Sequence, residues 1–149
     1  MPVSKNEVIA RCAEVISAKK QTLLQALELL EDSLLTETKS SAGDKHETGR
    51  ARVQEEQRKL LGMLNEFLEM EKTVRQLEKS ASESFQQSKL VSTDKGLFFL
   101  GLSLGRVEVK GATVFVISSV SPLGAELSKR RPGEIFGFRD VNYKVLDIW

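Results

Sequence analysis

Cysteine and histidine are almost absent from this sequence of 149 residues. The single cysteine, Cys12, excludes an intramolecular disulfide and any cysteine-based zinc site. The single histidine, His46, excludes any site that needs two imidazole ligands. No apolar run approaches the roughly 20 residues of a membrane span, and the N-terminal residues lack the apolar stretch of a signal peptide. We therefore expect a soluble cytoplasmic protein with no membrane partner.

An excess of charge of either sign is also missing. Lysine and arginine number 22 and aspartate and glutamate 21, which gives a formal net charge of +1. This balance disfavours both a strongly basic nucleic-acid binder and an acidic tail protein, and leaves only local charged patches. Hydrophobic residues make up 40% of the chain, which is not the composition of a disordered protein.

Proline, glycine and aromatic residues are scarce in the first part of the chain and frequent in the last. From Val3 to Lys95 there is no proline, whereas most of the glycines and aromatic residues follow from Gly96 onward. Helices tolerate few glycines and prolines, while strands and turns use glycine and aromatic residues. The sequence therefore predicts an α+β protein, with a helical part over residues 1–85 and a small β-rich domain over residues 86–149.

Two apolar stripes with helical spacing occupy the first part. Ser4 and Glu7 fit a capping box at the start of the first helix. Steps of three and four residues define the first stripe: Val8, Cys12, Val15, Leu23, Leu27, Leu30 and Leu34. The second stripe comprises Leu60, Leu64, Phe67, Val74, Leu77 and Ala81, and we expect Leu61 and Leu68 to widen it. Because Cys12 belongs to a stripe, we interpret it as a small core residue rather than a nucleophile.

A polar segment with two glycines, Lys39–Arg50, separates the stripes. The arms on either side, Ser4–Thr38 and Thr48–Ser82, are equally long, which predicts an antiparallel helical hairpin with its tip at about residues 39–50. Each arm would be roughly 50 Å long. The periodicity leaves an alternative open, in which the two helices form an ordinary bundle, for example by dimerisation.

Alternating apolar residues in the last part predict short antiparallel strands. The strand-like segments are 97–104, 106–111, 113–118, 135–138 and 143–148. Lys110-Gly111 and Pro132-Gly133 are typical of turns. Ser121 as the N-cap and Pro122 as the first helical residue predict one short helix, from Leu123 to about Arg130.

Asp44 and Glu47 are the candidate metal ligands. If the second helix begins here, the two carboxylates share a face near its first turn. Such a pair suits Mg²⁺, but it is too small for a private site, so it would complete a site whose other ligands come from a partner. The alternative is structural, because aspartate at the N-cap and glutamate at N3 also form a capping-box variant. Arg50 and Arg52 follow and are candidates for phosphate contacts.

Two motifs carry a resemblance to a known family. The segment Gly43-Asp44-Lys45-His46-Glu47-Thr48-Gly49 is similar to the hairpin-tip motif of the Gre transcript-cleavage factors of bacterial RNA polymerase. Ile117–Gly124, which contains Ser121-Pro122-Leu123-Gly124, and the following Lys129–Glu134 resemble a stretch in the C-terminal domain of the same family. The order of the parts and the hairpin length also agree, so the resemblance covers nearly the whole chain.

The resemblance implies a fold and a function. Gre factors pair a coiled-coil hairpin with an FKBP-like domain, which docks at the rim of the polymerase's secondary channel while the hairpin enters it. The implied role of Asp44 and Glu47 is to help hold a second Mg²⁺ jointly with the polymerase, which then hydrolyses backtracked RNA. Arg50 and Arg52 become candidates for contacts with RNA or the channel near the RNA 3′ end, and Ser121–Gly124 for polymerase docking. The chain would be a monomeric accessory factor rather than an enzyme.

The chain also departs from the family pattern. Thr48 replaces an asparagine, and Ala51 replaces an aromatic residue. These differences keep a second hypothesis open, a regulator or inhibitor that binds the secondary channel without stimulating cleavage. A peptidyl-prolyl isomerase and a plain coiled-coil adaptor are further alternatives; the first lacks an aromatic-lined pocket signature, and the second leaves the polar tip unexplained.

Overall fold

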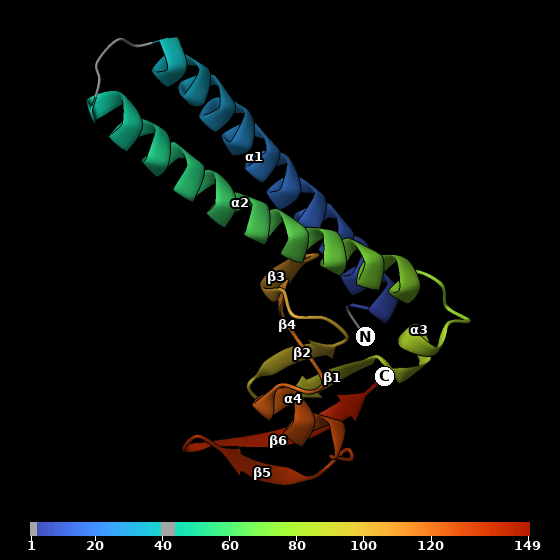
Figure 1. Ribbon diagram of the computed structural model, residues 1–149. Coiled ribbons are helices and arrows are strands. Elements are labelled where there is room, and N and C mark those ends of the chain that lie inside the picture. Colours follow the sequence, from blue (N-terminus) through green and yellow to red (C-terminus); the bar gives the residue numbers. More distant parts are fainter. Residues whose placement is uncertain (1–2, 40–43) are drawn as a thin grey trace. The chain divides into compact units, whose positions relative to one another are not determined.

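The computed structural model describes the backbone of residues 3–39 and 44–149 and the side chains of residues 3–36 and 49–149. Its elements are α1 (Lys5–Lys39), α2 (Asp44–Leu77), α3 (Glu83–Gln87), β1 (Lys89–Thr93), β2 (Gly96–Leu100), β3 (Gly105–Val109), β4 (Ala112–Ile117), α4 (Pro122–Ser128), β5 (Ile135–Phe138) and β6 (Val141–Ile148). The helices α1 and α2 form a long hairpin, and a small sheet with a short helix follows (Figure 1). The expected α+β class and helical hairpin are confirmed. Among the described residues, no helix has the length and apolarity needed to cross a membrane.

The chain divides into two compact units, and the division passes through both long helices. One unit is Ile16–Glu69, and the other joins the start of the chain, up to Val15, to Met70–Trp149. The sequence predicts a boundary between residues 85 and 86 instead. The start of α1 and the end of α2 belong to the same unit as the sheet, because their apolar side chains are buried there. Leu77, for example, is buried beside Gly101.

The unit Ile16–Glu69 has the burial pattern of a two-stranded coiled coil. Its least exposed apolar residues are spaced by three, four or seven positions, which is the seam expected of paired helices: Ile16, Leu23, Leu27, Leu30 and Leu34 on α1, and Val53, Leu60, Leu64 and Phe67 on α2. The predicted widening of the second stripe is wrong, because Leu61 and Leu68 are 45% and 39% exposed. Sequence reasoning also missed Ile9 and Ile16, which are buried, and misassigned Ala81, which is exposed and lies beyond α2.

The predicted capping box at the start of α1 is confirmed. The Glu7 amide donates to Ser4 Oγ at 3.2 Å, and the Ser4 amide donates to Glu7 Oε1 at 3.0 Å. These two bonds satisfy backbone donors that the first turn of a helix leaves without partners.

The sheet has six strands in the order β3-β4-β2-β1-β6-β5. Four of its five strand pairs are antiparallel, while β2 and β4 run parallel, with Leu97 beside Val114 and Leu100 beside Ile117. The short crossover through β3 makes this parallel pair possible. The prediction that all strands pair antiparallel is therefore wrong for β2 and β4.

Both faces of the sheet are buried over part of its width. Neighbouring positions Leu90, Phe99 and Val116 line one face across β1, β2 and β4, and all three are fully buried. The opposite face holds a second core, which includes Leu127 from α4: Val91, Phe98, Leu100, Leu127, Phe136 and Val145. A sheet covered on both faces forms a larger core than a domain of this size could make with one face.

Several elements differ from the prediction. The helix α2 ends at Leu77 rather than Ser82, because Ser82 caps the separate helix α3 and its hydroxyl donates to Gln76 O at 2.6 Å. The predicted strand over residues 97–104 ends at Leu100. Sequence reasoning missed β1 entirely, because its residues, Lys89–Thr93, include no aromatic residue or glycine.

Candidate functional site

The predicted metal-binding pair lies at the start of α2, which begins at Asp44. Positions 44 and 47 therefore fall in the first turn of the helix, and positions three apart share a face. The polar segment is shorter than expected, since Gly49 and Arg50 are already helical. The side chains of Asp44 and Glu47 lie outside the described residues, so their role as metal ligands stays a prediction. Among the described residues, no group of three or more histidine, cysteine, aspartate or glutamate side chains could hold a metal ion.

Arg50 and Arg52, the candidates for RNA or channel contacts, are both exposed on α2. Two positions correspond to about 200° around an α-helix, so the arginines lie on nearly opposite flanks. Position 50 lies three residues beyond position 47 and continues its flank. Arg52 instead lines a shallow hollow of about 400 Å³ with Glu55 and Glu56. The two arginines therefore cannot contact one ligand in the same way.

The predicted docking segment Ser121–Gly124 first of all builds the start of α4. Ser121 Oγ accepts a hydrogen bond from the Gly124 amide at 3.2 Å and donates one to Ser118 O at 2.6 Å. A Cβ on Gly124 would lie 1.9 Å from Ser118 O, so only glycine fits this close approach of α4 to the preceding loop. Ser121 as N-cap and Pro122 as first helical residue are confirmed.

Ser121 and Gly124 are not exposed, so the accessible surface around this segment comes from neighbouring side chains. Leu123 packs against the core beneath α4, whereas Pro122 is exposed. Sequence reasoning missed the adjacent Val120, which is 87% exposed and is the most exposed large apolar residue described. The sequence signal that could have indicated this exposure is a single valine in a loop directly before Ser121-Pro122. Docking through Ser121–Gly124 stays a prediction, and Val120 and Pro122 are the side chains that are free to make such contacts.

A hydrogen bond and an ion pair connect the start of α1 to the sheet. Arg11 Nε donates to Glu108 O at 3.0 Å, and Glu7 forms an ion pair with Lys110 in the turn between β3 and β4. The hydrogen bond from Lys110 and the one from the Ser4 amide hold the pKa of Glu7 below its usual value. Lys110 adopts a positive φ of 50°, as its predicted place in a turn requires.

Lys5 has a structural role at the same end of the chain. Its ammonium group donates to Phe85 O at 3.0 Å and to Ser88 O at 2.7 Å, and lies 4.4 Å from the centre of the Phe85 ring. Burial lowers the pKa of this lysine. The contacts cap the C-terminal end of α3, where carbonyl groups lack helical partners.

Cys12 has the properties of a core residue, as its place on the stripe predicts. The side chain is fully buried, and burial raises the pKa of its thiol to about 11. A nucleophilic cysteine needs the opposite, a lowered pKa and access to solvent. The burial and the raised pKa of Cys12 are those of a structural core residue.

Lys129, Arg130 and Arg131 form a basic cluster just after α4. Two of these side chains already contact neighbouring acids. Arg130 lies 2.6 Å from Glu126 and 3.7 Å from Glu134, and its guanidinium stacks 4.6 Å from the centre of the Phe136 ring. Lys129 is 3.8 Å from Glu126. Arg131 is exposed, and its described bonds are those of its backbone: the amide donates to Glu134 Oε1 at 3.0 Å, and the carbonyl accepts from the Glu134 amide at 3.1 Å.

Comparison with known proteins yields no match, neither to a family model nor to a curated protein or a solved structure.

Proposed function

We propose that the chain is a transcription factor that binds in the secondary channel of RNA polymerase and stimulates cleavage of backtracked RNA. The observation that carries the proposal is that α2 begins at Asp44. The two acids of the Gre-like motif thereby occupy the first turn of the second helix of a hairpin, next to its connection. A capping role alone does not require a hairpin of this length.

The length of the hairpin suits a buried target. With 35 residues, α1 is about 52 Å long at 1.5 Å per residue. Hydrolysis of a phosphodiester by two metal ions requires carboxylates beside both metals, and the polymerase itself supplies those of the first. Two additional carboxylates on a narrow helical hairpin would supply what is missing, because a hairpin of two helices is thin enough for a channel.

In this proposal, the chain contributes metal ligands and a phosphate contact to a reaction that the polymerase carries out. Asp44 and Glu47 would contribute oxygen ligands to a Mg²⁺ ion that the polymerase and the RNA also bind, and they would orient the attacking water. Arg50, on the flank that continues from position 47, would contact a phosphate of the RNA. The protein would act as an accessory factor in the cytoplasm, as a monomer, with the reaction taking place in the polymerase active centre.

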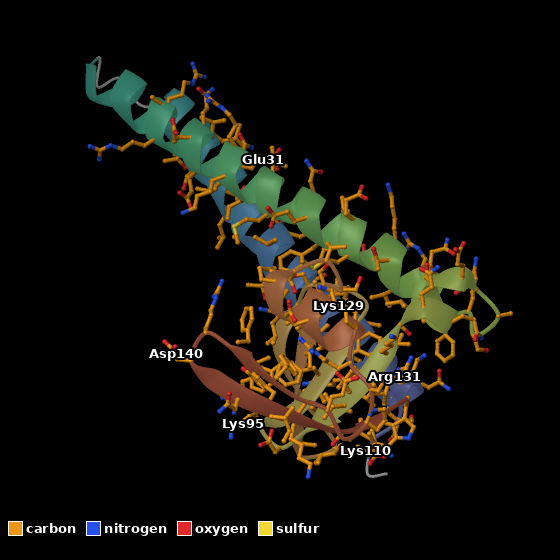
Figure 2. All side chains as sticks on the ribbon, turned by 90° about the horizontal axis from the view of Figure 1, so that it is seen from below. Glu31, Lys95, Lys110, Lys129, Arg131 and Asp140 are labelled. Atoms are coloured by element: carbon orange, nitrogen blue, oxygen red, sulfur yellow. The ribbon has the colours of Figure 1, made fainter. Side chains whose placement is uncertain are left out.

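A cleavage assay with the cognate RNA polymerase tests the proposal. Backtracked elongation complexes with 5′-labelled RNA receive either the wild-type protein or the variant Asp44→Ala/Glu47→Ala, and shortening of the RNA is followed with time. We expect shortening with the wild-type protein and its loss with the variant. The matched control is Glu28→Ala/Glu31→Ala, which removes two exposed acids with the same spacing from the shaft of α1 (Figure 2 labels Glu31) and should cleave normally.

The alternative function is a regulator that binds the channel without promoting cleavage, and Thr48 and Ala51 favour it. In that case the wild-type protein would leave the RNA intact but would compete with an active cleavage factor for the elongation complex. If the chain neither promotes cleavage nor competes, the polymerase hypothesis is wrong and the two acids cap α2.

A further inference from the structure

The strand β5 is an open edge of the sheet. It is the last strand in the order β3-β4-β2-β1-β6-β5, and no other strand of the described chain lies beyond it (Figure 1). The opposite edge is different, because Arg11 from α1 donates a hydrogen bond to Glu108 O on β3. Edge strands present unpaired backbone groups on which a further strand can form.

The pairing of β5 with β6 identifies the backbone groups at the open edge. A two-residue turn of Arg139 and Asp140, both with positive φ, joins the strands and places Phe138 opposite Val141. In an antiparallel ladder, hydrogen-bonded and non-hydrogen-bonded pairs alternate. The Val145 amide donates to Glu134 O at 2.9 Å, so the bonded positions on β5 are Glu134, Phe136 and Phe138. The amide and carbonyl groups of Ile135 and Gly137 therefore point outward.

Nothing in β5 protects this edge against a further strand. Its four residues, Ile135–Phe138, contain no proline and no charged side chain, which are the usual means by which edges are blocked. Ile135 is 67% exposed, and Leu146, diagonal to it on β6, is 44% exposed. The edge thus offers backbone hydrogen bonds together with an apolar side chain for an added strand to cover.

The charges around the edge are mainly positive. Arg131 lies just before β5, Arg139 directly after it, and Lys144 is paired with Ile135 across β6, and all three are exposed. Of the nearby acids, Glu134 already contacts Arg130 and the Arg131 amide. Figure 2 shows Arg131 and Asp140 towards opposite ends of the β5–β6 ribbon. A strand lying along β5 would therefore meet Arg131 at one end, Lys144 beside it, and at the other end Arg139, which stacks on Phe138 and is followed by the exposed Asp140.

From these observations we infer that β5 is a docking edge for an extended, acidic segment of a partner protein, which adds to the sheet as a seventh strand. The outward groups of Ile135 and Gly137 bind the backbone of the segment, an apolar side chain of the segment covers Ile135, and its carboxylates pair with Arg131, Arg139 and Lys144. A second copy of this chain fits less well, because two β5 strands side by side bring the same cations together. The inference does not depend on the proposed function.

A peptide-binding experiment tests the inference. The probe is a fluorescent synthetic peptide of alternating glutamate and valine, blocked at both ends, with the corresponding lysine–valine peptide for comparison. We expect the glutamate peptide to bind the wild-type protein and to slow exchange of the Ile135 and Gly137 amide protons. Arg131→Glu/Lys144→Glu should weaken this binding by about fivefold or more and allow the lysine peptide to bind instead.

Two further variants separate strand addition from general charge attraction. Ile135→Pro removes an outward amide that the β5–β6 ladder does not use, so it should abolish binding. Arg75→Glu/Lys79→Glu makes the same change of charge in the last turn of α2 and just beyond it, and should leave binding unchanged. The inference is overturned if the glutamate peptide does not bind, if the α2 variant weakens it equally, or if the Ile135 and Gly137 amides stay unprotected. Dimerisation of the wild-type protein that Ile135→Pro abolishes would also overturn it, because a second copy would then occupy the edge.

Discussion

At the scale of single residues, Gly124 is the position least able to accept a side chain. We expect Gly124→Ala to lower the free energy of unfolding by about 3 kcal/mol, because the new Cβ would meet Ser118 O and displace the start of α4. Urea unfolding followed by circular dichroism measures the change.

Gly62 provides the matched control for this substitution. It lies in α2 with nothing within 4 Å of an added Cβ, so Gly62→Ala should stabilise its helix by about 0.5–1 kcal/mol. If Gly124→Ala is as stable as the wild type, the close approach of α4 to Ser118 is wrong.

Cys12 gives a second prediction at this scale. With the pKa of its thiol raised to about 11, only about one thiol in a thousand is ionised at pH 8, and the side chain is buried. A coloured thiol reagent should therefore react with the folded protein very slowly and with the urea-unfolded protein at once. Rapid reaction under native conditions would contradict the burial of the start of α1.

At the scale of elements, the contact between α1 and the β3–β4 turn should make stability depend on pH. The pKa of Glu7 is lowered in the folded protein by its bonds with Lys110 and Ser4, so its contribution is present above the usual value of 4.5. The stabilisation by Glu7 is lost as the pH falls from 4.5 through the lower pKa that Glu7 has in the folded protein. We expect the difference in unfolding free energy between the wild type and Glu7→Gln to shrink between about pH 6 and pH 3.

The control for this prediction is internal. Asp94 and Glu108 also have lowered pKa values and contribute to acid sensitivity, but they are present in both proteins and cancel in the difference. A difference that stays constant with pH would show that the carboxylate of Glu7 does not stabilise the fold.

Elements also show how much the sequence could predict. The start of α1, the β5 strand and the start of α4 were predicted because a few neighbouring residues determine each: Ser4 with Glu7, the run Ile135–Phe138, and Ser121 with Pro122. The end of α2 was not, because Ser82 caps α3 and bonds to Gln76 O instead of continuing the helix. The strand β1 was not, because it depends on distant partners. Lys89–Thr93 becomes a strand by pairing with both β2 and β6, which no local pattern reveals.

The candidate site follows the same rule. Its position at the start of α2 could be predicted, because charge and glycine content mark the break between the helices. The structural role of Gly124 and the exposure of Val120 could not, because both depend on how the loop before α4 folds back on itself. The open edge at β5 was also beyond the sequence, since it follows from the order of the strands.

At the scale of the whole molecule, we propose that one chain combines a helical hairpin, which carries two acids at the start of its second helix, with a domain that binds a partner protein. The hairpin unit has an apolar seam along both of its helices. The domain is held together by two layers of apolar side chains, one on each face of its sheet. We propose above all that the two acids share a metal with RNA polymerase.

The dependence of the cleavage rate on Mg²⁺ concentration tests this claim most directly. Cleavage in backtracked complexes is measured over a range of Mg²⁺ with the wild-type protein and with Asp44→Asn/Glu47→Gln, which keeps the shape of both side chains but removes their charge. We expect the wild type to reach its half-maximal rate at a lower Mg²⁺ concentration than the variant, because the carboxylates help to bind the second ion. Identical Mg²⁺ dependence for the two proteins would contradict it.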